Sequence, residues 1–183
     1  MKNTLYLCLI LCLTACADAS PERKQVADLM DQLDQAKTVF EANGPETLPM
    51  TVQDIQTRLD KVSLAYQARG EKFDIRVGNV LADFKVFKKV FKSLPEKRND
   101  IQKELDLSYA QLKSMDHDLK HGMMPKTEIQ ANLSKEQDAV LALTASVAQL
   151  DTLMTRGRRG YIAKLPGIEA LIDSMSSLAP LAE

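Results

Sequence analysis

The chain of 183 residues contains no tryptophan, and aromatic residues make up only 5% of it. Its three cysteines, Cys8, Cys12 and Cys16, all fall within the first sixteen residues. The rest of the chain therefore holds no disulfide framework, no cysteine-based metal site and no cysteine nucleophile. It also lacks a glycine-rich phosphate loop and a Gly-x-Ser-x-Gly nucleophile elbow. These absences leave enzymatic activity without positive support.

The chain also lacks an excess of charge of either sign. The chain carries 24 Lys and Arg against 25 Asp and Glu, a net charge of -1. It therefore has none of the cationic excess on which nucleic-acid binding depends, and we expect no nucleic-acid partner. With 45% hydrophobic and 27% charged residues, the composition is typical of a folded protein rather than of a disordered one.

Long hydrophobic runs are confined to the N-terminus. Lys2 precedes a mostly apolar run over residues 5–15. A helix of that length spans about 16 Å, roughly half of a bilayer core. The run is therefore too short for a transmembrane helix and is typical of a secretory signal. No later run approaches the ~18 apolar residues that a membrane span requires.

The end of this signal carries the most specific motif in the chain. Leu13-Thr14-Ala15-Cys16 resembles the lipobox of bacterial lipoproteins, in which a bulky apolar residue and two small residues precede the cysteine. The resemblance implies cleavage after Ala15, a diacylglyceryl thioether on Cys16 and acylation of the new amino group. Residues 1–15 are then the signal peptide, 16–19 a lipidated tether and 20–183 the folded domain. The alternative is a soluble exported protein that is cut near the same place.

The resemblance also implies a location. In bacterial lipoproteins, Asp directly after the lipidated cysteine commonly retains the protein in the inner membrane, and here Ala17 follows Cys16. We therefore expect a cell-envelope lipoprotein on the outer membrane that faces the periplasm. Several acyl chains on one residue anchor a protein stably, because each buried methylene contributes about 0.8 kcal/mol. The covalent lipid on Cys16 is the only non-protein group we expect, with no cofactor.

Prolines divide the remaining chain into segments with helical spacing. Val26, Leu29, Leu33, Ala36 and Phe40 recur every three or four residues, and no segment shows the alternation of a strand. Proline is tolerated at helix starts but not in their interiors, so we predict helix boundaries near the prolines. The predicted helical segments are 20–43, 51–92, 93–121, 125–156 and a short one at 167–178.

The apolar stripes last only three to four heptads each. This favours an all-α fold, an elongated helical bundle or antiparallel coiled-coil hairpins of four long helices plus a short C-terminal helix. Gly70 and Gly78 predict a kink or break inside 51–92, and Gly157 predicts the end of the fourth helix. Whether 51–92 and 93–121 form one rod or a hairpin stays open. The hairpin of 93–121 with 125–156 is the better supported one.

Two basic stretches are candidate binding surfaces. In residues 81–94 a phenylalanine face adjoins a lysine arc, which is typical either of a helix on an anionic surface or of a core helix with solvated lysines. In residues 156–164 arginines sit beside glycine, either to bind a phosphate or carboxylate or to neutralise a helix end. The candidate residues are Lys85, Lys88, Lys89, Lys92, Arg156, Arg158 and Arg159.

The only two histidines form a near match to a zinc-protease motif. His117-Asp118-Leu119-Lys120-His121 has the i, i+4 histidine spacing that shares one metal, with Asp in the place of Glu. A third ligand would have to be a carboxylate such as Asp116. The other interpretation is a solvated helix end, since histidine near a helix C-terminus interacts favourably with the helix dipole. The favoured interpretation is non-catalytic and metal-free, with a zinc hydrolase using His117, Asp118 and His121 as the alternative.

Together these features predict a membrane-anchored envelope lipoprotein that acts as a helical structural, spacer or adaptor protein. Its partners would be the membrane, through the lipid, and a protein whose identity the residues do not give. The alternative function is peripheral binding of anionic envelope material, lipid headgroups or lipopolysaccharide, through 81–94 and 156–164. Homo-oligomerisation stays open, because apolar stripes pair equally well within and between chains.

Overall fold

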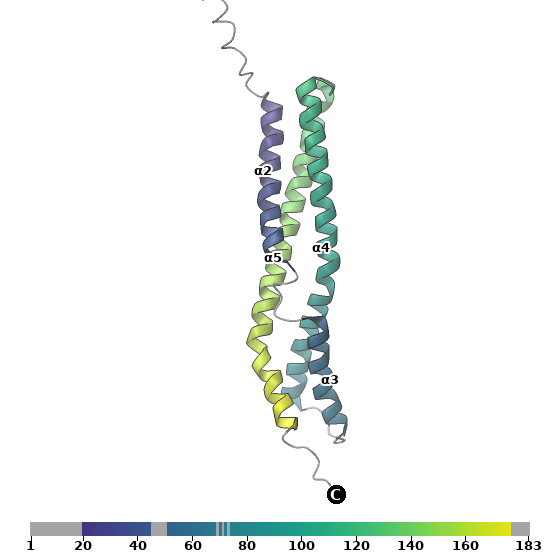
Figure 1. Ribbon diagram of the computed structural model, residues 1–183, viewed down its shortest axis with the longest axis vertical. Coiled ribbons are helices and arrows are strands. Elements are labelled where there is room, and N and C mark those ends of the chain that lie inside the picture. Colours follow the sequence, from purple (N-terminus) through teal and green to yellow (C-terminus); the bar gives the residue numbers. More distant parts are fainter. Residues whose placement is uncertain (1–19, 45–50, 69, 71, 73, 177–183) are drawn as a thin grey trace, which may run out of the picture.

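The computed structural model describes residues 20–44, 51–68, 70, 72 and 74–176. Every regular element among them is a helix, and four helices pack together into an elongated bundle (Figure 1). The predicted all-α fold is therefore confirmed. The predicted signal peptide, the tether and residues 177–183 of the predicted domain lie outside the described residues. The helices are α2 (Pro21–Ala42), α3 (Val52–Ala68), α4 (Ile75–His121) and α5 (Lys126–Ser176).

The bundle is built on the two longest helices, α4 and α5, which lie side by side along the whole rod (Figure 1). Helix α2 packs on one half of this pair and α3 on the other. Ion pairs mark the two levels, with Arg23 Nε 2.8 Å from Asp116 Oδ1 and Arg58 Nε 2.6 Å from Glu169 Oε1. The rod is therefore three helices thick at either level. The 47 residues of α4 give it a length of about 70 Å.

The apolar stripes face a continuous core along the rod. In α2 the predicted stripe, from Val26 to Phe40, is buried at all five positions. In α3, Ile55, Leu59 and Val62 are buried in the same way. Because each level has only three helices, the core is a thin seam of aliphatic side chains with an aromatic cluster in the α3 half. Burial of this seam supplies the main stabilisation, since a fully buried Leu or Val contributes roughly 1.5–3 kcal/mol.

The first two helices begin where the sequence predicts. Ser20 caps α2 by accepting a hydrogen bond from Arg23 N at 3.3 Å, with Pro21 in the first turn. Thr51 and Asp54 form a reciprocal capping box at α3, with Thr51 N donating to Asp54 Oδ2 at 2.9 Å and Asp54 N donating to Thr51 Oγ1 at 3.1 Å. The hydrogen bond from the Thr51 backbone holds the pKa of Asp54 below its usual value.

The predicted helix start at Ser93–Glu96 is wrong, because α4 continues through Pro95. The chain breaks earlier, between α3 and Asp74, whose carboxylate caps α4 by accepting from Arg76 N at 2.8 Å and Val77 N at 2.9 Å. Residues 75–121 are thus one rod, and only 51–68 form a separate helix. Packing outweighs the proline, since Phe91 and Leu94 before it are each 2% exposed and Ile101 after it is 9% exposed.

The predicted end of the fourth helix at Gly157 and the separate short helix at 167–178 are also wrong. Helix α5 runs without interruption from Lys126 to Ser176, through both Gly157 and Pro166. Gly157 is buried, and a Cβ atom there would lie 3.0 Å from Cε1 of Phe91. This glycine is therefore a packing site for a ring of α4 rather than a helix stop. Gly122, with φ 64°, does end a helix, because it caps α4 at the α4–α5 turn.

Arg98 of α4 holds the C-terminal end of α2. Its Nη1 donates to the carbonyl oxygen of Phe40 at 3.0 Å and also to that of Asn43. Its guanidinium lies over the Phe40 ring, 4.2 Å from the centroid. Asn43 Nδ2 in turn donates to Asp151 Oδ1 of α5 at 2.7 Å. Arg98 thus binds two carbonyl oxygens at the end of α2, and Asp151 binds the side-chain amide of Asn43, so both neighbouring helices hold this end in place.

Two glycine substitutions should have opposite effects on stability. Gly78 is the fourth residue of α4, and a Cβ atom there has nothing within 4 Å. Gly78→Ala should raise the free energy of unfolding by about 0.5–1 kcal/mol, because alanine is the better helix former. Gly157→Ala should lower it, since the new methyl group meets the Phe91 ring. Urea unfolding followed by circular dichroism measures both, and a stabilising Gly157→Ala would contradict the packing of this ring.

Candidate functional site

The phenylalanine face of residues 81–94 lies in the core. Phe84, Phe87 and Phe91 of α4 surround Tyr161 of α5, with ring centroids 5.6, 6.0 and 6.4 Å from that of the tyrosine. All three contacts are edge-on, the favourable arrangement for aromatic rings. Phe84, Phe91 and Tyr161 are buried and Phe87 is half-buried. This face therefore belongs to the bundle and is not available to a membrane surface.

The same packing brings the two basic stretches to one level of the rod. Phe91 contacts Gly157 and Phe87 contacts Gly160, so residues 85–92 lie against residues 156–160. The stretches are far apart in the sequence, and their meeting could not be read from it. The exposed members of the predicted set are Lys85, Lys89, Lys92, Arg156 and Arg159.

These basic side chains do not all point at one ligand position. Lys88 is half-buried, and its Nζ donates to Gln56 Oε1 of α3. Lys164, also in the second basic stretch, has its Nζ 2.9 Å from Asp83 Oδ2. Lys89 instead lines a groove between α4 and α5. The predicted set is therefore divided among several faces of the rod.

The histidine pair lies at the α4 end, beside the α4–α5 turn. The two rings are 4.3 Å apart between centroids, and both side chains are exposed. His121 Nδ1 is 2.8 Å from the backbone oxygen of His117, and Asp116, the carboxylate considered as a third ligand, binds Arg23. In the part of the chain that the structure describes, no three His, Cys, Asp or Glu side chains are grouped so as to hold a metal ion.

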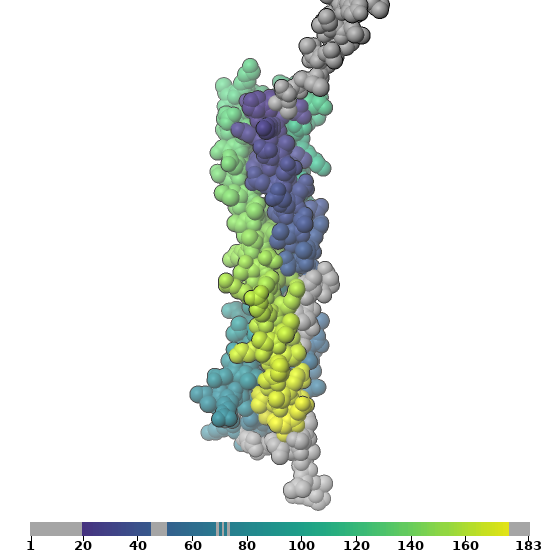
Figure 2. Space-filling model, turned by 90° about the vertical axis from the view of Figure 1, so that its left-hand side faces the viewer, coloured from purple at the N-terminus to yellow at the C-terminus, as the bar shows by residue number. Residues whose placement is uncertain are grey.

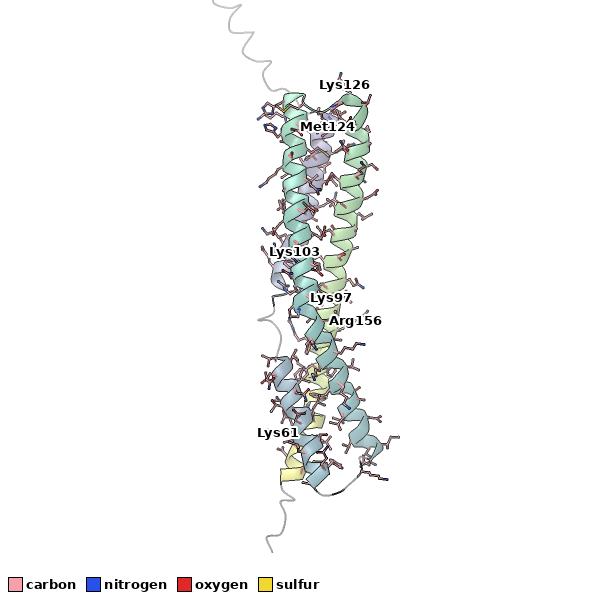
Figure 3. The ribbon with its side chains drawn as sticks, turned by 90° about the vertical axis from the view of Figure 1, so that its right-hand side faces the viewer. Lys61, Lys97, Lys103, Met124, Lys126 and Arg156 are labelled. Carbon is pink, nitrogen blue, oxygen red and sulfur yellow. The ribbon has the colours of Figure 1, made fainter. Side chains whose placement is uncertain are left out.

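A groove of about 630 Å³, which the sequence did not predict, runs between α4 and α5. Its described lining comes from these two helices alone, so it opens on the face away from α2 and α3. Val90, Ile101, Leu150 and Leu153 provide apolar lining, and Lys89, Lys97 and Asp100 add charged side chains from α4. Figure 3 shows Lys97 and Arg156 at nearly the same height of the rod, on α4 and α5 respectively.

The α5 side of this groove carries no charge. Residues 139–150 contain no Asp, Glu, Lys or Arg, although Leu141, Ala142, Ala145, Ser146 and Gln149 are exposed. Ser146 and Gln149 line the groove, and Leu141, outside its lining, is 66% exposed. A solvated helix face normally carries charged residues, so three turns without any are unusual. This uncharged run is the signal in the sequence that points to the groove.

Burial perturbs titratable groups at separate levels of the bundle. Glu136 of α5 has one buried oxygen, Oε2, that forms no hydrogen bond with the residues that the structure describes, and burial raises the pKa of this carboxyl. The buried Tyr161 hydroxyl has no hydrogen-bond partner among these residues either, and burial raises its pKa. Burial and the hydrogen bond to Asp34 raise the pKa of Tyr109 to about 12. Tyr109 contacts Asp34 of α2, whereas Tyr161 lies in the half of the rod that α3 covers. These groups therefore do not form one acid–base site.

Two further observations concern the predicted lipid anchor. Cys16, the predicted lipidation site, lies outside the described residues. None of the helices that the structure describes combines the length and the apolar character that crossing a bilayer requires.

Comparisons of the chain with family models, with curated proteins and with solved structures found no match.

Replacing Glu136 should test the cost of its burial. Because its pKa is raised in the folded state, the folded protein binds this proton more tightly than the unfolded chain does. Its stability contribution therefore improves as pH falls through the folded pKa and is complete below the ordinary value of 4.5. Glu136→Gln should raise the urea midpoint at pH 7.5 and have little effect at pH 4. The exposed Glu104→Gln is the control, and a Glu136→Gln variant that is less stable than the native protein at pH 7.5 would contradict this reasoning.

Proposed function

We propose that this protein is a lipid-anchored helical rod of the bacterial cell envelope that acts as a spacer or adaptor and not as a catalyst. The observation that carries the proposal is the position of the lipobox-like Leu13-Thr14-Ala15-Cys16. It ends only four residues before Ser20, the cap of α2. A lipid on Cys16 would thus be joined directly to one end of the rod.

The geometry of that end supports an upright rod. The first turn of α2 lies beside the end of α4, where Arg23 binds Asp116, so the α4–α5 turn is at the same end (Figure 1). Four residues span at most about 14 Å, which keeps this turn close to the membrane surface. The other end of α4 would then stand about 70 Å away. Such a rod is suited to hold a binding surface at a set distance from the membrane.

We also propose that α4 and α5 are the antiparallel coiled-coil hairpin that the heptad pattern suggests. Val80 faces Gly167, Phe87 faces Gly160 and Phe91 faces Gly157. In these pairs the residue number decreases along α5 as it increases along α4. The two helices are joined by only a four-residue turn, 122–125. Short connections of this kind favour antiparallel neighbours.

The alternative function is binding of anionic lipid headgroups or lipopolysaccharide through Lys85, Lys88, Lys89, Lys92, Arg156, Arg158 and Arg159. The meeting of both basic stretches at one level favours it. In an upright rod, however, Lys92 lies about 45 Å along α4 from the turn. This function therefore requires the rod to lie along the membrane, which makes orientation the decisive measurement.

The anchor is tested by Cys16→Ala. This variant should lose incorporation of labelled palmitate, and the protein should be found either soluble or as the uncleaved precursor. Cys12→Ala, which lies within the predicted signal, should keep both the label and membrane retention. Cell fractionation and mass spectrometry of the N-terminus measure the outcome. A processed Cys16→Ala protein that stays on the membrane would contradict the proposal.

Orientation is tested with single engineered cysteines, because a lipidated Cys16 leaves the mature chain without a free thiol. Met123→Cys, at the α4–α5 turn and 64% exposed in the native residue, should place a fluorophore where a headgroup quencher reaches it. Val86→Cys, beside the lysines and 59% exposed, and Lys61→Cys, in α3, should be quenched little. Strong quenching at position 86 would instead favour the rod lying along the membrane.

A further inference from the structure

We infer that the groove between α4 and α5 is the docking site for an acidic amphipathic helix of a partner protein. This inference names the class of partner for the proposed adaptor role. It rests on that role, because the role requires a partner protein. Its evidence is the shape, charge and exposure of the groove itself.

The groove has the shape that a helix requires. Lys89, Ser93 and Lys97 follow one another at i, i+4 spacing on α4, and Ser146 and Leu153 face them from α5. The lining spans about twelve residues of α4, about 18 Å or three helical turns. In the upper part of Figure 3, α2 lies behind α4 and α5, and the side of α4 and α5 that faces the viewer is uncovered. Figure 2, viewed from the other side, shows α2 along only the upper half of α5. A helix in the groove would pack there as the additional helix of a bundle.

The exposed surface beside the groove fits close helix packing. Ser146 lines the groove, and Ala142, one turn before it on α5, is likewise small, exposed and without charge. Helix axes approach within about 8–10 Å, at a distance set by the side chains at the contact, so small residues allow a close approach. Leu150 and Leu153 add apolar lining. The buried part of the partner should therefore be apolar, with spacing of three and four residues.

The charges of the groove select an acidic partner. In the described lining, Lys89 and Lys97 stand against a single acidic residue, Asp100, and Arg156 is exposed near the height of Lys97 (Figure 3). A second copy of this chain is a poorer occupant. A two-fold contact would set this basic groove against itself, and like charges would then face one another.

The first experiment uses two synthetic helical peptides with identical leucine and alanine faces, flanked either by glutamates or by lysines. The protein is the mature chain with Cys16→Ala, produced without the signal segment, so that no lipid takes part. Fluorescence anisotropy should show binding of the acidic peptide at least tenfold tighter than that of the basic one. No binding of the acidic peptide, or equal binding of both, overturns the inference.

Two lysines of α4 provide a matched pair of variants. Lys97 lines the groove, whereas Lys103 is exposed on the same helix outside its lining. Lys97→Glu should weaken binding of the acidic peptide at least tenfold and strengthen that of the basic one. Lys103→Glu should change neither more than about twofold. Equal effects of the two substitutions overturn the inference, and circular dichroism checks that both variants fold.

The second experiment places a photo-crosslinking residue at Ser146 in cells, with position 103 as the control. A crosslink from 146, absent from 103, to an acidic amphipathic helix of another protein supports the inference. A crosslink to a second copy of this chain, a crosslink to lipid, or none overturns it. Failure of the Cys16→Ala test would remove the anchored adaptor but leave the peptide result standing, so the two proposals fail separately.

Discussion

The packing of phenylalanine rings from α4 against two glycines of α5 is the contact on which the length of the rod depends. Phe91 fits against Gly157 and Phe87 against Gly160, with Tyr161 among the rings. These contacts bring the two helix backbones close together a short way from Pro95 and Pro166. Each proline removes a backbone hydrogen bond at a cost of roughly 3 kcal/mol. Burial of the ring cluster offsets that cost, and both helices remain continuous.

The contrast between local effects and long-range packing explains which features of the fold were predictable. Cap residues act locally, so Ser20 and the Thr51–Asp54 pair were visible in the sequence and are confirmed. The stripe of α2 follows from helical periodicity and is buried as expected. Pro95 and Gly157, by contrast, were misinterpreted as boundaries. Local propensity favours a break at both. Packing between α4 and α5 reverses the outcome, as the contact of the Phe91 ring with Gly157 shows.

The candidate site shows the same division. The lysines of 81–94 were identified, but their separation into different faces depends on where α3 and α5 lie, as the bond from Lys88 to Gln56 shows. The groove is a property of two helices that are distant in the sequence and packed side by side. Its only trace within one segment is the absence of charge over 139–150. Long-range packing thus decides both where the basic residues point and which surface stays open.

The direction of the helices also determines how the rod carries tension. Helix α2 begins at the end of the rod where α5 begins, and α5 finishes at the opposite end (Figure 1). A pull between the two ends of the chain therefore draws α2 and α5 along each other in opposite senses. Such a load acts in shear and falls on all of their side-by-side contacts at once, including the link from Asn43 to Asp151. Peeling would break those contacts one at a time, so this arrangement of helices makes the rod resistant to stretching along its axis.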